Sequence, residues 1–286
     1  AAPSGTVFLA AASQRTKRIR LGSLVLLLPF YEPLRLIEEV CMLDHLSNGR
    51  LEIGIGKGIS PAEHSLWGED PETARDRFEE AFEILRTGLA KPTFSFSGDN
   101  HVFENVSIPH RPLQKPQPGF WYPGNVDYAG KHRLNTITGG PPEAIKNAMS
   151  HYRTQLEQPE ADWNPGVLDP VIGATLHIYL ASSKQAAVER VHQAFPAYHR
   201  NLVTLFERYD IPFTDPSLGG DTDLALKLGV LVAAAPENAV EQIELLVAET
   251  GIEYLTLSFA WGNLTHEETM DSLHLFVNEV MPHFQQ

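Results

Sequence analysis

A short glycine-rich segment with one cation is the part of this sequence best suited to bind a ligand. It reads Gly54-Ile-Gly-Lys-Gly58 and follows directly from an apolar run. Because glycine has no side chain, backbone N–H groups can approach a ligand oxygen closely, and Lys57 adds a positive charge that suits a phosphate. The spacing matches neither the P-loop nor the dinucleotide fingerprint. The segment is therefore a candidate anion site, with an ordinary strand-end turn as the alternative.

A strand–helix–strand unit positions this segment. Continuous apolar runs at residues 19–28, which stop at Pro29, and at residues 51–55 predict two strands that are buried on both faces. Between them, Pro33 begins a helix with an apolar face, and Asn48-Gly49 ends it. This order is typical of two parallel strands joined by a crossover helix.

The same alternation continues along the chain. Six buried strands are predicted, nearly all separated by helices, at residues 19–28, 51–56, 119–123, 135–138, 171–181 and 253–260. A small exposed hairpin is predicted after residue 93. Alternating strands and helices indicate a parallel βαβ architecture. Six strands cannot close an eight-stranded barrel, and an open sheet would leave two edges unprotected, so we expect a strand–helix–strand before Ala1.

Composition limits the class of protein. The 286 residues, 43% of them hydrophobic, suffice for one large α/β domain or two ordinary ones. A formal net charge of -14 disfavours nucleic acid and anionic membranes as partners. No run approaches the roughly 18 apolar residues of a membrane span, and no signal peptide is recognisable. The single cysteine, Cys41, lies among apolar residues and is predicted to be an inert core thiol. We therefore predict a soluble, cytoplasmic protein.

The chain resembles the bacterial luciferase-like monooxygenases over essentially its whole length. The resemblance rests on four segments, which are Thr16-Lys-Arg-Ile-Arg-Leu-Gly22, Leu43-Asp-His-Leu-Ser-Asn-Gly-Arg50 with the glycine-rich segment after it, Ile137-Thr-Gly-Gly-Pro-Pro-Glu143 and Gly251-Ile-Glu-Tyr-Leu-Thr-Leu-Ser-Phe259. It implies an α/β fold of the (β/α)8 TIM-barrel type. We therefore expect residues 1–286 to form a single luciferase-like barrel domain in which the first two strands are missing.

The resemblance also implies reduced flavin mononucleotide (FMN) at the carboxyl end of the barrel, where it reacts with O2 to oxygenate a small organic substrate. Lys57 matches a basic residue that contacts the flavin phosphate, with Gly58 beside it. Gly56 occupies the position next to the reactive flavin carbon, where a missing side chain would leave room for oxygen or substrate. Leu24-Val25 matches a strand-end pair that often carries a non-prolyl cis peptide bond under the flavin ring.

Three further segments belong to the expected site. Gly124-Asn125 falls where the family has a serine-rich phosphate loop, which is shortened here. Thr138-Gly139-Gly140 sits where backbone should approach the ring system, with a helix-entry turn as the alternative. Trp261, just beyond the last predicted strand, either walls the substrate cavity or packs in the core.

The catalytic residue is not identified by the sequence. In the family it is a histidine in a Glu-His-His run on the second strand, which we expect in the missing segment. His64, in the loop after the glycine-rich segment, is a weak candidate for catalysis. His45 lies near the end of a helix, where a cation interacts favourably with the helix dipole. Asp44 and Arg50 are predicted to be a structural pair that brackets the turn at residues 47–49.

The leading hypothesis is a flavin-dependent monooxygenase that acts with a separate flavin reductase, because no nicotinamide fingerprint is visible. One alternative is an oxidoreductase of the same fold that uses the deazaflavin F420 for hydride transfer. Another is a non-catalytic member, either a flavin-binding protein or a supporting subunit, and a buried cation at Lys57 would argue against a supporting subunit without flavin. Metal ligands are not expected.

A homodimer is also expected. In the family, dimers pack through helices near the beginning of the barrel, so we predict an interface that includes helices 33–47 and 76–89. The first of these carries more apolar residues than one barrel face requires, namely Leu34, Ile37, Val40, Cys41 and Leu43.

Overall fold

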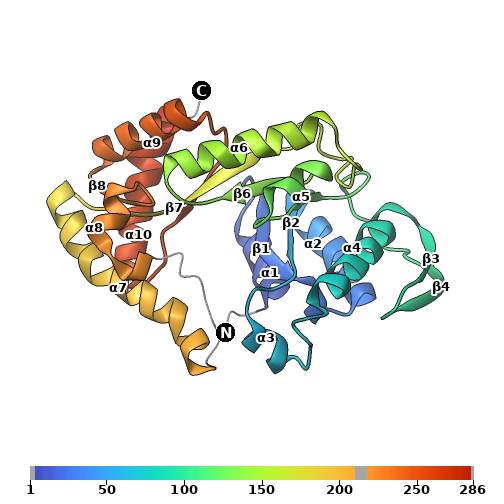
Figure 1. Cartoon of the computed structure of the whole chain (residues 1–286). Helices are drawn as coiled ribbons and strands as arrows, with labels where there is room; N and C mark the ends of the chain where they lie inside the picture. The colour runs from blue at the N-terminus through green and yellow to red at the C-terminus, as the bar shows by residue number, and fades with distance from the viewer. Residues whose placement is uncertain (1–3, 210–217, 285–286) are drawn as a thin grey trace. The chain divides into compact units, whose positions relative to one another are not determined.

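The computed structural model describes residues 4–209 and 218–284 (Figure 1). The chain falls into two compact units. Unit 1 consists of Ala1–Thr136 and Tyr152–Val171, and unit 2 of Ile137–His151 and Ile172–Gln286. Each unit has its own parallel strand pairs and its own buried residues.

Unit 1 contains a three-stranded parallel sheet and a separate antiparallel hairpin. The sheet order is β1-β2-β5, and β3 pairs with β4 in the predicted hairpin. Its elements are α1 (Gly5–Arg15), β1 (Leu21–Leu27), η1 (Leu28–Phe30), α2 (Pro33–Ser47), β2 (Leu51–Gly56), α3 (Pro61–Leu66), α4 (Ala74–Ala90), β3 (Thr93–Ser97), β4 (Val102–Ser107), β5 (Gly119–Trp121) and α5 (Val126–Lys131).

Unit 2 is built around β7, which pairs in parallel with both β8 and β9 and neighbours β6. The unit boundary falls within β6 (Thr136–Thr138) and α6 (Pro142–Glu157). The other elements are β7 (Ile172–Leu180), α7 (Lys184–Arg208), η2 (Leu218–Gly220), α8 (Thr222–Lys227), β8 (Leu231–Ala234), α9 (Pro236–Thr250), β9 (Leu255–Ser258), α10 (His266–Leu275), the π-helical η3 (Phe276–Val280) and η4 (Met281–Phe284).

The six predicted strands are all present, and the predicted parallel architecture is confirmed. The sequence missed β8, because its four apolar residues lead almost directly into Pro236, which begins α9. A run this short does not distinguish a strand from the start of a helix. None of the sheets in the described residues is closed, so the eight-stranded barrel and the strands expected before Ala1 stay predictions.

The helices of unit 1 cover one face of its sheet. Along β2, Leu51, Ile53 and Ile55 are 2% exposed or less, and α2 packs against this strand. From α4, the ring of Phe82 meets that of Phe120 on β5 edge to face, with 5.1 Å between the ring centroids. Figure 1 shows α2 between β2 and α4, and α2 packs against both. This layer of aliphatic and aromatic side chains is the main apolar core of the unit.

Most of the apolar side chains of α2 that were expected to need a partner are buried inside unit 1 itself. Ile37 and Cys41 are 0% exposed and Val40 is 1% exposed, because α1 and α4 both pack against α2. The argument that this helix carries excess apolar surface is therefore wrong. Cys41 lies in the core as predicted, and burial raises the pKa of its thiol to about 11.

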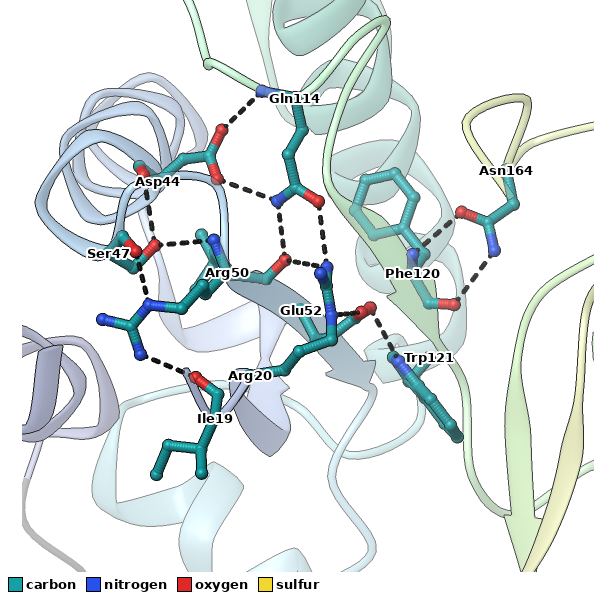
Figure 2. Close-up of polar contacts among 11 residues, drawn as sticks. Ile19, Arg20, Asp44, Ser47, Arg50, Glu52, Gln114, Phe120, Trp121 and Asn164 are labelled. Atoms are coloured by element: carbon teal, nitrogen blue, oxygen red, sulfur yellow. Dashed lines mark hydrogen bonds and ion pairs between the residues drawn. The ribbon is translucent and has the colours of Figure 1, made fainter. Parts of the chain in front are cut away.

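A polar network fastens the amino ends of β1 and β2 (Figure 2). The Arg50 guanidinium donates to the carbonyl oxygens of Ser47 and Ile19, both at 2.6 Å. Asp44, which is fully buried, accepts hydrogen bonds from the backbone N–H of Gln114 at 2.9 Å and from its side-chain Nε2 at 2.8 Å. Both residues therefore have structural roles, as predicted. Instead of pairing with each other, Arg50 binds the end of α2 and the residue before β1, and Asp44 binds Gln114.

Replacing Arg50 by Met should lower the free energy of unfolding by about 2–4 kcal/mol, because five acceptor oxygens lose a charged donor. Urea denaturation followed by circular dichroism measures the change. Arg35→Met is the matched control, since Arg35 pairs with Glu38 on the surface with 71% and 61% of the two side chains exposed. The control should change stability by less than about 0.5 kcal/mol, and equal effects of the two variants would contradict the prediction.

The core of unit 2 contains an imidazole. His177 on β7 lies against the rings of Tyr198, Trp261 and Phe195, with centroid distances of 4.5, 5.6 and 6.4 Å. Burial disfavours the charged imidazolium and lowers the pKa of His177 to about 4.

The stability of the protein should therefore fall on acidification between about pH 6.5 and pH 4. In this interval the unfolded chain binds a proton at His177 that the folded chain does not, so the free energy of unfolding decreases by about 2–3 kcal/mol. Chemical denaturation at a series of pH values tests this. His177→Leu should flatten the dependence, whereas replacing the exposed His283 by Leu should not. The same pH slope in wild type and His177→Leu would reject the assignment.

Candidate functional site

Glycine recurs on the face of the unit 1 sheet opposite to the helices. Side chains alternate along β2, so Glu52, Gly54 and Gly56 lie on the face away from the buried aliphatic residues. The strand register places Gly22 of β1 and Gly119 of β5 beside Glu52 on this same face. We refer to it as the glycine-lined face. The side chains of Glu52 and, beside Gly54, of Trp121 lie on it as well, so its glycines make room for neighbouring atoms rather than leave bare backbone.

β1 contains a β-bulge opposite Gly54. The register shifts between Ser23 and Leu26, so Leu24 and Val25 together oppose Gly54. The peptide bond between Leu24 and Val25 is cis, as the resemblance implied. The Leu24 side chain is 51% exposed. A Cβ at Gly54 would overlap the carbonyl oxygen of Ser23, so only glycine fits opposite the bulge.

Val25 fills the space in front of Gly56. A Cβ at Gly56 would lie 2.6 Å from Cγ2 of Val25, well inside the contact distance of two carbon atoms. The open space for oxygen or substrate that was expected at Gly56 is therefore closed by a side chain of the neighbouring strand. Glycine at this position is required by packing between β1 and β2.

Lys57 follows at the carboxyl end of β2. Its side chain is exposed and forms no ion pair with any residue in the described part of the chain. The expectation of a buried cation is wrong, because the lysine leaves the strand end toward solvent, where the ammonium keeps its hydration. The ammonium is therefore available to an anion.

His64 is buried beside the glycine-rich segment. Gly58 has a φ of 84°, and a Cβ there would lie 2.9 Å from the Nε2 atom of His64. The His64 side chain is 2% exposed, and its ring and that of Phe30 form a T-shaped pair with 4.8 Å between the centroids. Its Nδ1 atom is buried without a hydrogen-bond partner. His64 is the one of the two histidines considered from the sequence, His45 and His64, that the structure places beside the glycine-rich segment.

The loop after β5 uses its polar side chain for the fold. Asn125 accepts a hydrogen bond from the backbone N–H of Tyr128 at 2.8 Å and so caps α5. Gly124 has a φ of 111°, which favours glycine, and a Cβ there would meet no atom within 4 Å. The pair begins a short helix, and its role in phosphate binding stays a prediction.

The other predicted site residues belong to unit 2. Thr138-Gly139-Gly140 leads from β6 toward α6, and a Cβ at Gly139 would lie 3.2 Å from Cγ2 of Thr175. Trp261 is 7% exposed, and its Nε1 donates to the carbonyl oxygen of Ile178 at 3.3 Å. The contacts give Trp261 a packing role in the core of unit 2, and a place in a substrate pocket stays a prediction.

Sequence reasoning missed Glu52 and Phe30. Glu52 lies on the glycine-lined face, pairs with Arg20 and accepts a hydrogen bond from Nε1 of Trp121 at 2.9 Å (Figure 2). A carboxylate between two buried aliphatic residues of one strand is the signal that would have found it. Phe30 stands outside any motif, and its contacts with His64 and Trp67 follow only from the fold.

Other features of the described residues bear on the kind of site. His45 donates through Nε2 to the carbonyl oxygen of Arg111 at 2.8 Å and stacks on His110, which fits a structural role. Within residues 4–209 and 218–284, no group of three or more His, Cys, Asp or Glu side chains is placed to hold a metal ion. In the same residues, every helix is too short or too polar to cross a membrane.

Comparisons with known proteins identify the family. A family model described as luciferase-like monooxygenase matches residues 1–254. The chain is 26% identical to the oxygenase component of the flavin-dependent trigonelline monooxygenase of Acinetobacter baylyi, over 100% of this chain and 82% of that protein.

Two solved structures have the same fold. Monooxygenase RslO1 from Streptomyces bottropensis aligns with a TM-score of 0.81 and 25% identity, covering 99% of this chain and 84% of that one. The oxygenating constituent of 3,6-diketocamphane monooxygenase from Pseudomonas putida, in complex with FMN, aligns with a TM-score of 0.78 and 18% identity, covering 98% and 84%. The chain is therefore an oxidoreductase with a mixed α/β fold, and it belongs to the luciferase-like monooxygenase family.

Proposed function

We propose that this protein is a monooxygenase that uses reduced FMN and O2 to oxygenate a small organic substrate. The observation that carries the proposal is the exposed ammonium of Lys57 at the end of β2, which has no ion pair within residues 4–209 and 218–284. A bound flavin would supply the reaction with O2, while the protein supplies binding, orientation and exclusion of water.

The residues of unit 1 fit such a cofactor. Lys57 and the backbone N–H groups around it offer a positive charge and hydrogen-bond donors to a phosphate. The half-exposed side chain of Leu24, at the bulge opposite Gly54, offers aliphatic carbon to a ring system. We assign Lys57 and Gly58 to the flavin phosphate and Leu24-Val25 to the flavin ring.

The names of the relatives support the same kind of reaction. The trigonelline monooxygenase is flavin-dependent, and the matching chain is its oxygenase component, so that enzyme divides the work between components. The 3,6-diketocamphane enzyme holds FMN. We therefore propose that a separate reductase supplies reduced flavin to this protein as well.

Replacing Lys57 by Met keeps most of the side-chain stem and removes the charge. FMN binding should weaken by about 1.5–3 kcal/mol, roughly 10- to 150-fold in Kd, because a charge-assisted hydrogen bond to the phosphate is lost. Titration of FMN followed by flavin fluorescence measures the affinity.

Two controls separate the phosphate from the ring. Lys57→Arg retains a cation, so its FMN Kd should stay within about threefold of wild type. Riboflavin, which has no phosphate, should bind wild type and Lys57→Met equally. An FMN Kd that changes less than twofold in Lys57→Met would overturn the phosphate assignment. Tighter binding of F420 than of FMN to the wild type would favour the deazaflavin alternative.

We also propose a homodimer, with α1 and α2 in its interface. Four apolar side chains on these two helices remain exposed, Val7, Phe8, Met42 and Leu46, at 69, 65, 56 and 41%. The two helices pack against each other. The exposed positions of α4 are mainly charged, which makes the predicted helix 76–89 a poorer interface.

The double variant Phe8→Glu, Met42→Glu should shift the dimer toward monomer, because each dimer would bury four carboxylates in an apolar interface. Sedimentation velocity at micromolar concentration gives the oligomeric state. Leu245→Glu, at a 68% exposed position on α9, is the control and should leave the dimer intact. A monomeric wild type, or a double variant that remains dimeric, would refute the proposed interface.

A further inference from the structure

The imidazole of His64 is buried but has no polar partner in the described residues. The side chain is 2% exposed, and its Nδ1 atom is enclosed without a hydrogen bond. Most buried polar side-chain atoms in folded proteins are hydrogen-bonded, and each exception calls for an explanation. The ring of Phe30 packs against the imidazole in a T-shaped arrangement, and it carries no nitrogen or oxygen atom.

The other ring nitrogen faces the glycine-rich segment. Measured from the point where a Cβ of Gly58 would lie, Nε2 is at 2.9 Å, whereas Cε1 and Cδ2 are at 3.5 and 3.7 Å. Nε2 is therefore the ring atom nearest to the segment, and Gly58 admits it because it carries no side chain. The position of the ring is set by α3, whose first turn is capped by Ser60.

The chemistry of this arrangement suits an oxyanion. A neutral imidazole has one N–H group, and with Nδ1 enclosed only Nε2 is placed to donate toward the segment. Lys57, which precedes Gly58 in the chain, contributes an ammonium that has no ion pair among the described residues. A donor N–H, an ammonium and glycine backbone N–H groups together form a set of donors that a phosphate can accept from.

We propose that His64 is a phosphate-binding residue, whose Nε2–H donates a hydrogen bond to an oxygen of a phosphate monoester held by Lys57 and the glycine-rich segment. This replaces the catalytic role considered for His64 from the sequence. The identity of the ester rests on the proposed function, in which it is the phosphate of FMN. The phosphate site itself does not depend on that identity.

Nuclear magnetic resonance of the wild-type protein with 15N-labelled histidine tests the site without FMN. Inorganic phosphate, titrated at constant pH, should shift the imidazole signals of His64, which are assigned by their loss in His64→Gln. Potassium chloride at matched ionic strength should not shift them. Unchanged His64 signals at about 50 mM phosphate would overturn the inference.

Two variants test the donor itself. His64→Leu removes it and should weaken FMN binding about tenfold, whereas His64→Gln, whose amide can place an N–H near the Nε2 position, should stay within about threefold of wild type. Riboflavin affinity should be equal in all three proteins. Replacing the exposed His110 by Leu is the control for loss of a histidine and should change neither affinity.

The outcomes separate this inference from the proposed function. If phosphate shifts His64 but FMN does not bind, the phosphate site stands and the flavin function fails. If FMN binds with the same affinity to wild type and His64→Leu, the inference on His64 fails alone. Should His64→Leu not fold, as shown by circular dichroism, the phosphate titration of the wild type and the affinity of His64→Gln decide.

Discussion

The close approach of β1 and β2 is the constraint on which the rest of unit 1 depends. At the bulge, the carbonyl oxygen of Ser23 occupies the place where any larger residue at position 54 would put its Cβ. Two residues further along β2, the side chain of Val25 occupies the place where a Cβ at position 56 would lie. The glycines of β2 are thus required first by strand packing. They make room for atoms of β1 rather than leave bare backbone exposed.

The polar groups at the two ends of these strands differ in how far they are satisfied. At the amino ends, Arg50 and Asp44 satisfy backbone and amide groups of distant segments, and little of this network is free for a ligand. At the carboxyl end of β2, Lys57 has no ion pair in the residues that the structure describes, and Nδ1 of His64 has no hydrogen bond. In parallel α/β sheets, ligands bind at the carboxyl ends of the strands, and here that end carries the unpaired groups.

The sequence predicted those features that depend on neighbours along the chain. Continuous apolar runs located all six strands that were expected, and the proline at position 33 marked the start of α2. Features that depend on another strand or helix were not accessible. The contact of Val25 with Gly56 and that of His64 with Gly58 join residues of separate elements, and nothing in the local pattern indicates them. Whether Lys57 is exposed likewise depends on which residues pack around the end of β2, and the sequence of the segment does not show this.

Gly58 contributes both to the fold and to the candidate site, so a substitution there would change both. Its φ of 84° disfavours any residue with a side chain, and a Cβ would also lie 2.9 Å from the buried imidazole. A substitution here would therefore alter the turn that presents Lys57 and move the ring of His64 at the same time. Because Phe30 packs on that ring, the displacement would extend to the segment that follows β1. The residues that shape the candidate anion site are thus held in place by the same contacts that join β1, β2 and α3.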